Sequence, residues 1–418
     1  MGSSLTERDK KVIWHPYSPQ KYAPEPIPVV KGHGSWIFDE NGRRYLDAIS
    51  SWWVTIHGHA HPYIAGKIYR QALELEQVIF AGFTHAPAVN LAEKLLGILP
   101  GNFSKIFYSD NGSTAVEVAI KMATQFWWNK GEKKRNRILA FNHSYHGDTF
   151  GAMSVSERGL FTLAFHDRLF EVNFVDPPRI GVKQDISSLL EQCVCVIYEP
   201  LLQGAGGMNV YDAKALDEFI ALCRSHGVIC IADEVMTGFG RTGKMFASEN
   251  CVNKPDIICL SKGLTGGTMA MGVTACSKLI HDAFVTDDKK KTFFHGHSFT
   301  ANPLSCAAAL ASLDLFKIEN TFQHIGRIVR SHESFAARLA GYRNIKNIRQ
   351  CGTIIAFEIP DEVSGYTSSI RDVITASGLE NGVYLRPLGN TVYLMPPYCM
   401  SEEEMERVYE VVLEICTK

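Results

Sequence analysis

Short apolar runs rich in β-branched residues alternate with helix-like segments through the middle of the chain. The predicted strands are residues 105–108, 137–141, 171–175, 194–199, 228–232, 256–260 and 271–276. The predicted helices are residues 113–129, 213–226 and 302–317. Apolar strands that alternate with helices are typical of a parallel sheet buried on both faces. The pattern therefore predicts an α/β fold with a mostly parallel central sheet sandwiched by helices.

The N-terminal part of the chain follows another pattern. Residues 12–30 are rich in proline and aromatic side chains, which predicts an extended arm because proline blocks helix formation and lacks an N–H donor. Residues 35–39 and 44–47 flank a turn at Asn41-Gly42 and predict a β-hairpin. Residues 62–79 have the apolar spacing of a helix.

The chain after residue 319 mixes both patterns, with a helix, apolar strand runs at 353–357 and 391–394, and a final helix from Ser401. A chain of 418 residues is too long for one ordinary core. We therefore predict three segments. Residues 1–60 form an arm and part of a small domain, residues 61–318 a large domain, and residues 319–418 the C-terminal part of the small α/β domain.

Composition limits the function classes. Hydrophobic residues make up 46% of the chain, charged residues 21%, and the formal net charge is −2. This balance gives no electrostatic reason to expect nucleic acid or an anionic membrane as a partner. The 11 cysteines are scattered, which is typical of buried reduced thiols. The N-terminus has no signal-peptide pattern and no run of 18 apolar residues occurs, so we expect a cytoplasmic protein.

An acid and an amine follow two of the predicted strands. Asp233 comes directly after the run 228–232, and Lys262 closely follows the run 256–260. The carboxyl ends of parallel strands are where open α/β sheets bind ligands. A pyridoxal phosphate (PLP) enzyme needs this pair, because the lysine forms a Schiff base and the carboxylate keeps the pyridine nitrogen protonated. At an effective dielectric near 20, a carboxylate–pyridinium contact at about 4 Å is worth roughly 4 kcal/mol.

Two further loops follow predicted strands. Gly112 and Ser113 open the predicted helix 113–129, where free N–H groups and the helix dipole can hold a phosphate; the alternative is an ordinary N-cap. Tyr145, in the loop after residues 137–141, can stack on a flat cofactor ring; the alternative is a surface loop.

Other motifs carry weaker signals. His57, His59 and His61 alternate, but the glycine and proline between them indicate a loop, and we predict no metal site. Trp52 and Trp53 either pack in the core or line a pocket. The glycine-rich stretch 238–243 lacks the strand and helix of a dinucleotide fingerprint, so we expect its glycines to carry Arg241 into a site.

Together these motifs resemble the class III PLP-dependent aminotransferases, from Trp14 to the C-terminus. The motifs are Asn111-Gly112-Ser113, Tyr145-His146-Gly147, Glu199-Pro200, Asp233-Glu234-Val235, Thr237 to Gly243, and Ser261-Lys262-Gly263. The resemblance implies the PLP-dependent transferase fold of type I and a homodimer with active sites built from both chains.

The resemblance also implies roles for single residues. Lys262 would form the Schiff base and move the proton, Asp233 would pair with the pyridinium, and Tyr145 would stack on the ring. Gly112 and Ser113 would hold the phosphate. The remaining implied contacts are His297 and Ser298, in a loop lent to the neighbouring subunit's phosphate, and the substrate-binding residues Tyr17, Trp52, Asp148, Arg241, Gly296 and Arg386.

Several stretches are most similar to the branch of the class that acts in biotin formation. They are Trp14 to Tyr17, Ser51 to Trp53, Ile56 to Gly58, Gln203 to Met208, Leu264 to Met269, and Tyr393 to Tyr398. This similarity implies transfer of an amino group from S-adenosylmethionine to 8-amino-7-oxononanoate, with Arg386 binding the keto acid's carboxylate. The alternative is another ω-aminotransferase of the class, with lysine, a diamine or an ω-amino acid as donor.

The chain departs from the class pattern at four positions. Met236 stands where many members have glutamine and Ala205 where many have glutamate, so 2-oxoglutarate or glutamate is not expected as a standard partner. The resulting apolar wall suits a longer aliphatic keto acid and a bulky donor. His297 and Ser298 stand where close members often have proline and threonine, although a serine hydroxyl can still donate to a phosphate.

Overall fold

The computed structural model describes residues 4–182, 185–361 and 368–416. The outermost residues of the predicted terminal segments, 1–3 and 417–418, lie outside the described residues. The helices are α1 Leu5–Val12, α2 Ser50–Trp53, α3 Pro62–Glu74, α4 Ala86–Ile98, α5 Gly112–Lys130, α6 Phe150–Ser154, α7 Ser187–Leu190, α8 Ala213–Ser225, α9 Lys278–Asp282, α10 Pro303–Ile318, α11 Thr321–Leu339, α12 Ile370–Glu380 and α13 Glu402–Cys416. The strands are β1 Val29–His33, β2 Trp36–Asp39, β3 Arg44–Asp47, β4 Phe103–Ser109, β5 Arg137–Phe141, β6 Asn173–Val175, β7 Cys193–Tyr198, β8 Leu202–Gln203, β9 Asn209–Val210, β10 Ile229–Asp233, β11 Ile257–Leu260, β12 Gly272–Ser277, β13 Lys346–Cys351, β14 Ile354–Glu358, β15 Val383–Tyr384 and β16 Thr391–Leu394.

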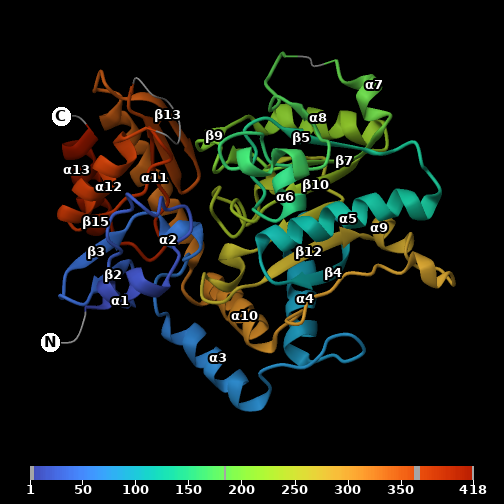
Figure 1. The fold of residues 1–418 in the computed structure, drawn as a ribbon, viewed down its shortest axis with the longest axis horizontal. Coiled ribbons are helices and arrows are strands. Elements are labelled where there is room, and N and C mark those ends of the chain that lie inside the picture. Colours follow the sequence, from blue (N-terminus) through green and yellow to red (C-terminus); the bar gives the residue numbers. More distant parts are fainter. Residues whose placement is uncertain (1–3, 183–184, 362–367, 417–418) are drawn as a thin grey trace.

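A seven-stranded sheet forms the middle of the molecule, in the order β4-β12-β11-β10-β7-β5-β6 (Figure 1). The neighbours from β11 to β6 pair in parallel. Strand β12 runs antiparallel to both β11 and β4. The prediction of a mostly parallel central sheet is confirmed, and each predicted strand overlaps one strand of this sheet.

Alternate residues of the central strands bury against different helices. Ile229 and Ile231 of β10 join a cluster that contains Val116 of α5. Cys230 and Ala232 of the same strand join a larger cluster that also contains α8 side chains. Because successive strand residues point to opposite faces, a strand covered by helices on both sides must be apolar throughout. This explains why these strands could be recognised as uninterrupted apolar runs.

The two ends of the described chain share one sheet. The predicted hairpin is confirmed as β2 and β3, and β15 pairs in parallel with β3 through Val383 and Leu46. In Figure 1 the blue N-terminal and red C-terminal segments accordingly lie together on one side of the molecule. A second small sheet has the order β13-β14-β16. The boundaries after residues 60 and 318 remain predictions.

The arm is extended only in part. Helix α1 occupies residues 5–12, and residues 13–28 contain neither helix nor strand. All eleven cysteines are free, and all except Cys351 and Cys399 are buried. Within the described ranges, no helix is both long and apolar enough to cross a membrane.

Candidate active site

A cavity of about 700 Å³ lies where β10 and β11 end. Its wall brings together the predicted residues Gly112, Ser113, Tyr145, Asp148, Asp233 and Lys262. It also contains Trp53, His146, Glu199 and Met236, which were not among the predicted site residues. Residues from loops far apart in the sequence therefore meet at the carboxyl edge of the sheet, as expected for an open α/β fold.

Lys262 begins a short turn of 3₁₀ helix directly after Ser261. Its φ of 46° lies in the left-handed region, a strained conformation for a residue with a side chain. Its ammonium lies 5.0 Å from the ring centroid of Trp53. Burial lowers the pKa of Lys262, although the carboxylates of Asp233 and Glu199 oppose this shift. A lowered pKa makes more of the lysine available as an uncharged nucleophile.

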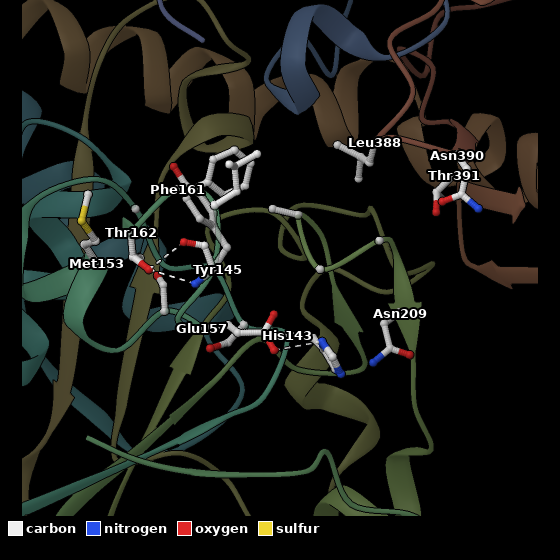
Figure 2. Close-up of a pocket in the computed structure, with 18 of the residues that line it drawn as sticks. His143, Tyr145, Met153, Glu157, Phe161, Thr162, Asn209, Leu388, Asn390 and Thr391 are labelled. Carbon is white, nitrogen blue, oxygen red and sulfur yellow. Dashed lines mark hydrogen bonds and ion pairs between the residues drawn. The ribbon is translucent and has the colours of Figure 1, made fainter. Parts of the chain in front are cut away.

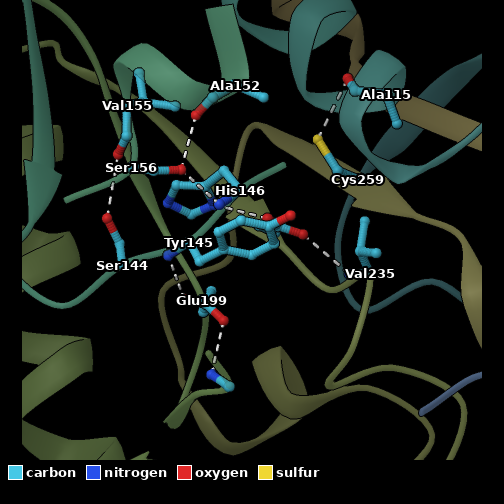
Figure 3. A network of polar contacts seen from close by, with 12 residues as sticks. Ala115, Ser144, Tyr145, His146, Ala152, Val155, Ser156, Glu199, Val235 and Cys259 are labelled. Atoms are coloured by element: carbon cyan, nitrogen blue, oxygen red, sulfur yellow. Dashed lines mark hydrogen bonds and ion pairs between the residues drawn. The ribbon is translucent and has the colours of Figure 1, made fainter. Parts of the chain in front are cut away.

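Asp233 is the last residue of β10. Figure 3 shows two of its neighbours, His146 and Val235, within one network of polar contacts. Oδ2 of Asp233 lies 2.6 Å from Nδ1 of His146, and Oδ1 of Asp233 accepts a hydrogen bond from the Val235 N–H at 3.1 Å. Both Asp233 and His146 are buried. A carboxylate with both oxygens occupied in this way is fixed in orientation, and Asp233 lies in the cavity wall.

Glu199 ties two loops of the site together. Its carboxylate accepts from the N–H of Tyr145 at 3.0 Å and from that of Gly204 at 2.9 Å. Burial raises the pKa of Glu199 to about 7, against the opposing effect of His146. Glu199 and His146 belong to the motifs Glu199-Pro200 and Tyr145-His146-Gly147. No local sequence pattern, however, indicates that their side chains lie near Asp233.

The N-terminus of α5 lies in the wall of the same cavity. The Asn111 side chain caps the helix by accepting from the Thr114 N–H at 2.9 Å. The cap takes up the N–H of Thr114, and the N–H groups of Gly112 and Ser113 lie before it in the chain. The hydroxyl of Ser113 accepts from the Thr149 N–H at 3.0 Å, which fixes the loop that follows Tyr145. A Cβ at Gly112 would lie 2.7 Å from Cγ1 of Val235, so this close approach requires glycine. Backbone N–H groups at a helix start suit a phosphate.

An aromatic pocket of about 240 Å³ surrounds the predicted substrate residues Tyr17, Trp52 and Arg386. The ring of Tyr17 contacts those of Trp52 and Phe161 edge to face, with centroids 5.3 and 5.6 Å apart. The Arg386 guanidinium lies 5.2 Å from the Trp52 ring centroid. The Tyr17 hydroxyl donates to Asp148, which links this pocket to the larger cavity. A cation between aromatic rings can bind the carboxylate of an otherwise apolar ligand.

A strained turn positions the two tryptophans. Ser50, Ser51, Trp52 and Trp53 all have positive φ, between 46° and 75°. The turn is held by the Ser50 hydroxyl, which donates to the Met395 carbonyl, and by the Ser51 hydroxyl, which donates to Asp47, both at 2.7 Å. Left-handed backbone costs about 1–2 kcal/mol per residue with a side chain. Strain of this kind is characteristic of functional sites.

A second cavity, of about 770 Å³, adjoins the first and shares Tyr145, Gly147 and Asp148 with it. Figure 2 shows its walls, which include Phe161 and an ion pair between His143 and Glu157. This cavity lies between the large domain and the C-terminal residues Leu388 and Thr391. It gives the site additional room beside Tyr145.

The structure does not bring every predicted residue to the cavities. Arg241 is 1% exposed, and its guanidinium donates to the carbonyls of Pro396 at 2.8 Å and Trp53 at 3.3 Å. Gly296, His297 and Ser298 lie in a loop beside α5 of their own chain, with His297 Nδ1 at 3.3 Å from Asp110 Oδ2. Contact of Arg241 with a substrate, and of this loop with a second subunit, remain predictions.

The three alternating histidines have separate partners. His59 contacts Asp47 at 2.8 Å, His61 contacts Glu319 at 2.9 Å, and His57 Nε2 lies 3.1 Å from the Ser312 hydroxyl. Across the described ranges, no group of three or more His, Cys, Asp or Glu side chains is placed to hold a metal ion.

The chain matches known proteins over almost its whole length. Residues 17–415 match the family model described as aminotransferase class-III. Adenosylmethionine-8-amino-7-oxononanoate aminotransferase of Synechococcus elongatus is 44% identical, over 96% of this chain and 98% of the relative. The crystal structure of the protein of that name from Methanocaldococcus jannaschii is 34% identical with a TM-score of 0.94, covering 98% of this chain and 99% of the other. An amine transaminase from an uncultivated Pseudomonas species, solved in a PLP-bound form, is 29% identical with a TM-score of 0.90, covering 97% and 98%.

Proposed function

The chain belongs to the class-III aminotransferases, and we propose that it transfers an amino group from S-adenosylmethionine to 8-amino-7-oxononanoate with pyridoxal 5'-phosphate as cofactor. The product of this reaction is 7,8-diaminononanoate, an intermediate of biotin formation. The observation that carries the proposal is the meeting of Lys262, Asp233 and the start of α5 in one cavity, with Arg386 in an aromatic pocket beside it. Relatives that are 34–44% identical over nearly the whole chain bear the name of this activity.

The cavity fits PLP in the type and placement of its groups. The α5 N–H groups at Gly112 and Ser113, with the close approach that Gly112 permits, suit the phosphate. Asp233 suits the pyridine nitrogen, and Tyr145 offers a ring face in the same wall. Lys262 supplies the amine that joins the aldehyde. When bound, PLP supplies an electron sink for the charge that develops on the substrate carbon.

The chain's own residues would carry out binding and proton transfer. Burial favours the uncharged form of Lys262, and its amine would be placed to accept a proton from the donor's α-carbon. His146 and the Val235 N–H hold Asp233 in place, so its carboxylate would favour the protonated form of the pyridine nitrogen of bound PLP. Tyr17 and Asp148, joined by a hydrogen bond, lie beside Tyr145, whose hydroxyl is 3.3 Å from that of Tyr17.

The residues that line the cavities and the aromatic pocket favour particular substrates. Met236 and Ala205 leave the cavity without the amide and carboxylate that other class members use, and Met236 is 6% exposed. Arg386, over the Trp52 ring in the aromatic pocket, offers the charge that a long keto acid needs at its far end. The second cavity beside Tyr145 gives room for a donor as bulky as S-adenosylmethionine. We also propose that the active unit is a homodimer, as the resemblance to the class III aminotransferases implies.

The two half-reactions test this proposal separately. With PLP bound, the cofactor absorbance should fall when S-adenosylmethionine is added without acceptor. It should recover when 8-amino-7-oxononanoate follows. Lysine, a diamine and an ω-amino acid serve as comparison donors. Bleaching by one of these, with no response to S-adenosylmethionine, would instead assign the chain to another ω-aminotransferase of the class.

A further inference from the structure

A segment that precedes α10 follows the outer face of α5 toward its N-terminus. The Gln125 side chain donates to the carbonyls of Lys291 at 3.1 Å and Thr292 at 3.0 Å. The Lys291 ammonium donates to the Asn129 carbonyl at 2.9 Å. Further along, the ring of His295 stacks on Phe293, with centroids 5.9 Å apart. The segment 291–297 is therefore fixed along the helix and ends beside its first turn.

Four side chains form a continuous polar chain at this place. The Lys121 ammonium lies 2.8 Å from Nδ1 of His295. Nε2 of His295 lies 3.1 Å from Nε2 of His297. Nδ1 of His297 lies 3.3 Å from Oδ2 of Asp110. The chain thus runs from the third turn of α5 to the residue that precedes its cap.

Donor and acceptor chemistry fixes the proton on each imidazole. An ammonium group only donates, so Nδ1 of His295 carries no proton and Nε2 carries it instead. Burial, together with Lys121, lowers the pKa of His295, which favours this neutral form. Nε2 of His297 then accepts, and its proton resides on Nδ1, toward Asp110. His297 thereby turns its Nδ1 toward the carboxylate of Asp110.

His297 faces only Oδ2 of Asp110, at 3.3 Å. The other oxygen, Oδ1 of Asp110, is buried and has no hydrogen-bond partner among the residues that the structure describes. Asp110 lies directly before Asn111, Gly112 and Ser113, which start α5. An uncompensated carboxylate at the start of a helix would repel an arriving phosphate.

We propose that His297, aligned by His295 and Lys121, is a positioning residue that compensates Asp110 and so strengthens phosphate binding at the start of α5. The inference rests on the proposed function, because it assumes that Gly112 and Ser113 receive the phosphate of PLP. His297 acts through Asp110 and within its own chain. This role is separate from any contact that the neighbouring Ser298 makes with a second subunit.

The test compares ligands with and without a phosphate group on the full-length apoprotein. PLP, pyridoxal and inorganic phosphate are titrated into the wild type and into His297→Ala, Asp110→Asn and the double variant. His281→Ala, at an exposed imidazole near Asp282, is the matched control. We expect His297→Ala to weaken PLP and phosphate binding about fivefold, the size expected for one partly exposed polar contact, with pyridoxal binding unchanged. In the Asp110→Asn background the same substitution should have no effect.

Three results would overturn the inference. The first is unchanged PLP affinity in His297→Ala. The second is an equal loss for PLP and pyridoxal, which would indicate a general disturbance of the fold. The third is a loss that persists in the Asp110→Asn background, since His297 would then act without that carboxylate. Failure of the proposed function is distinguishable, because the wild-type protein itself would then show no binding of PLP.

Discussion

At the scale of single residues, the site depends on four ionisable groups that line one cavity: Lys262, Asp233, His146 and Glu199. Burial lowers the pKa of the lysine and raises the pKa of Glu199. His146 orients Asp233, and Glu199 fixes the Tyr145 loop.

Replacing Lys262 with alanine should abolish turnover, because no other lysine among the residues that the structure describes lines the cavity to join the cofactor and move the proton. PLP should still bind, since the phosphate and ring contacts remain. The measurement is steady-state activity together with equilibrium dialysis of PLP. Turnover at the wild-type rate would remove Lys262 from the chemistry.

The raised pKa of Glu199 predicts that the stability of the protein depends on pH. Its pKa rises from 4.5 to about 7 on folding, so the folded state binds the proton more tightly. The contribution of this group to stability is therefore lost as pH rises from about 4.5 to about 7, by up to about 3 kcal/mol. Glu199→Gln removes the titration. In urea unfolding, the free energy of unfolding of the variant relative to that of the wild type should be higher at pH 8 than at pH 5. The same difference at both pH values would refute the assignment of this titration to Glu199.

Arg386 should distinguish the two substrates. In Arg386→Ala the KM for the keto acid should rise about 10- to 100-fold through loss of a charged hydrogen bond, while the KM for the donor changes much less. Steady-state kinetics with each substrate varied in turn provides the measurement. Equal increases for both substrates would mean that Arg386 serves a shared carboxylate site.

At the scale of elements, the loops at the sheet edge are held in strained or buried arrangements by distant segments. The left-handed turn at Ser50–Trp53 is tied to Met395 and Asp47. Arg241, from the loop after β10, binds the carbonyls of Trp53 and Pro396 and stacks at 5.1 Å from the ring centroid of Tyr398. The glycine-rich loop therefore anchors the turn that presents the tryptophans.

This arrangement predicts a mainly structural effect of Arg241. Arg241→Leu should destabilise the protein by about 2–4 kcal/mol, since two buried carbonyls lose their donors. Arg343→Leu, at an exposed arginine, is the control and should change stability little. Urea unfolding measures both variants. An unchanged stability with a raised KM would instead support the predicted contact of Arg241 with substrate.

At the scale of the whole molecule, apolar side chains remain exposed near the loop that was predicted to reach a second subunit. Phe294 is 75% exposed and Phe299 61%, and Ile79 and Phe83 are each 62% exposed. The two segments adjoin, because the Gln77 side chain donates to the Ser298 carbonyl at 2.6 Å. Exposed apolar groups gathered in this way are typical of an interface between proteins.

A homodimer through this surface should be sensitive to charge. Phe299→Glu should shift the protein toward monomer in light scattering and weaken PLP binding, because each site would lose the neighbouring loop. Val252→Glu, at a side chain that is 85% exposed elsewhere, is the control and should leave the assembly unchanged. A dimer that is equally stable in the Phe299 variant would place the interface on another face.

The sequence by itself determined the central strands, the main helices and the positions of Asp233, Lys262 and Gly112. These features follow from local signals, because apolar periodicity reports burial, and a polar residue directly after a buried strand must lie at the sheet edge. Only the tertiary structure decided the antiparallel direction of β12, the pairing of β15 with β3, the contact of His146 with Asp233, and the burial of Arg241. Each of these joins segments far apart in the chain, and no local pattern specifies which distant backbone or side chain will satisfy a buried polar group.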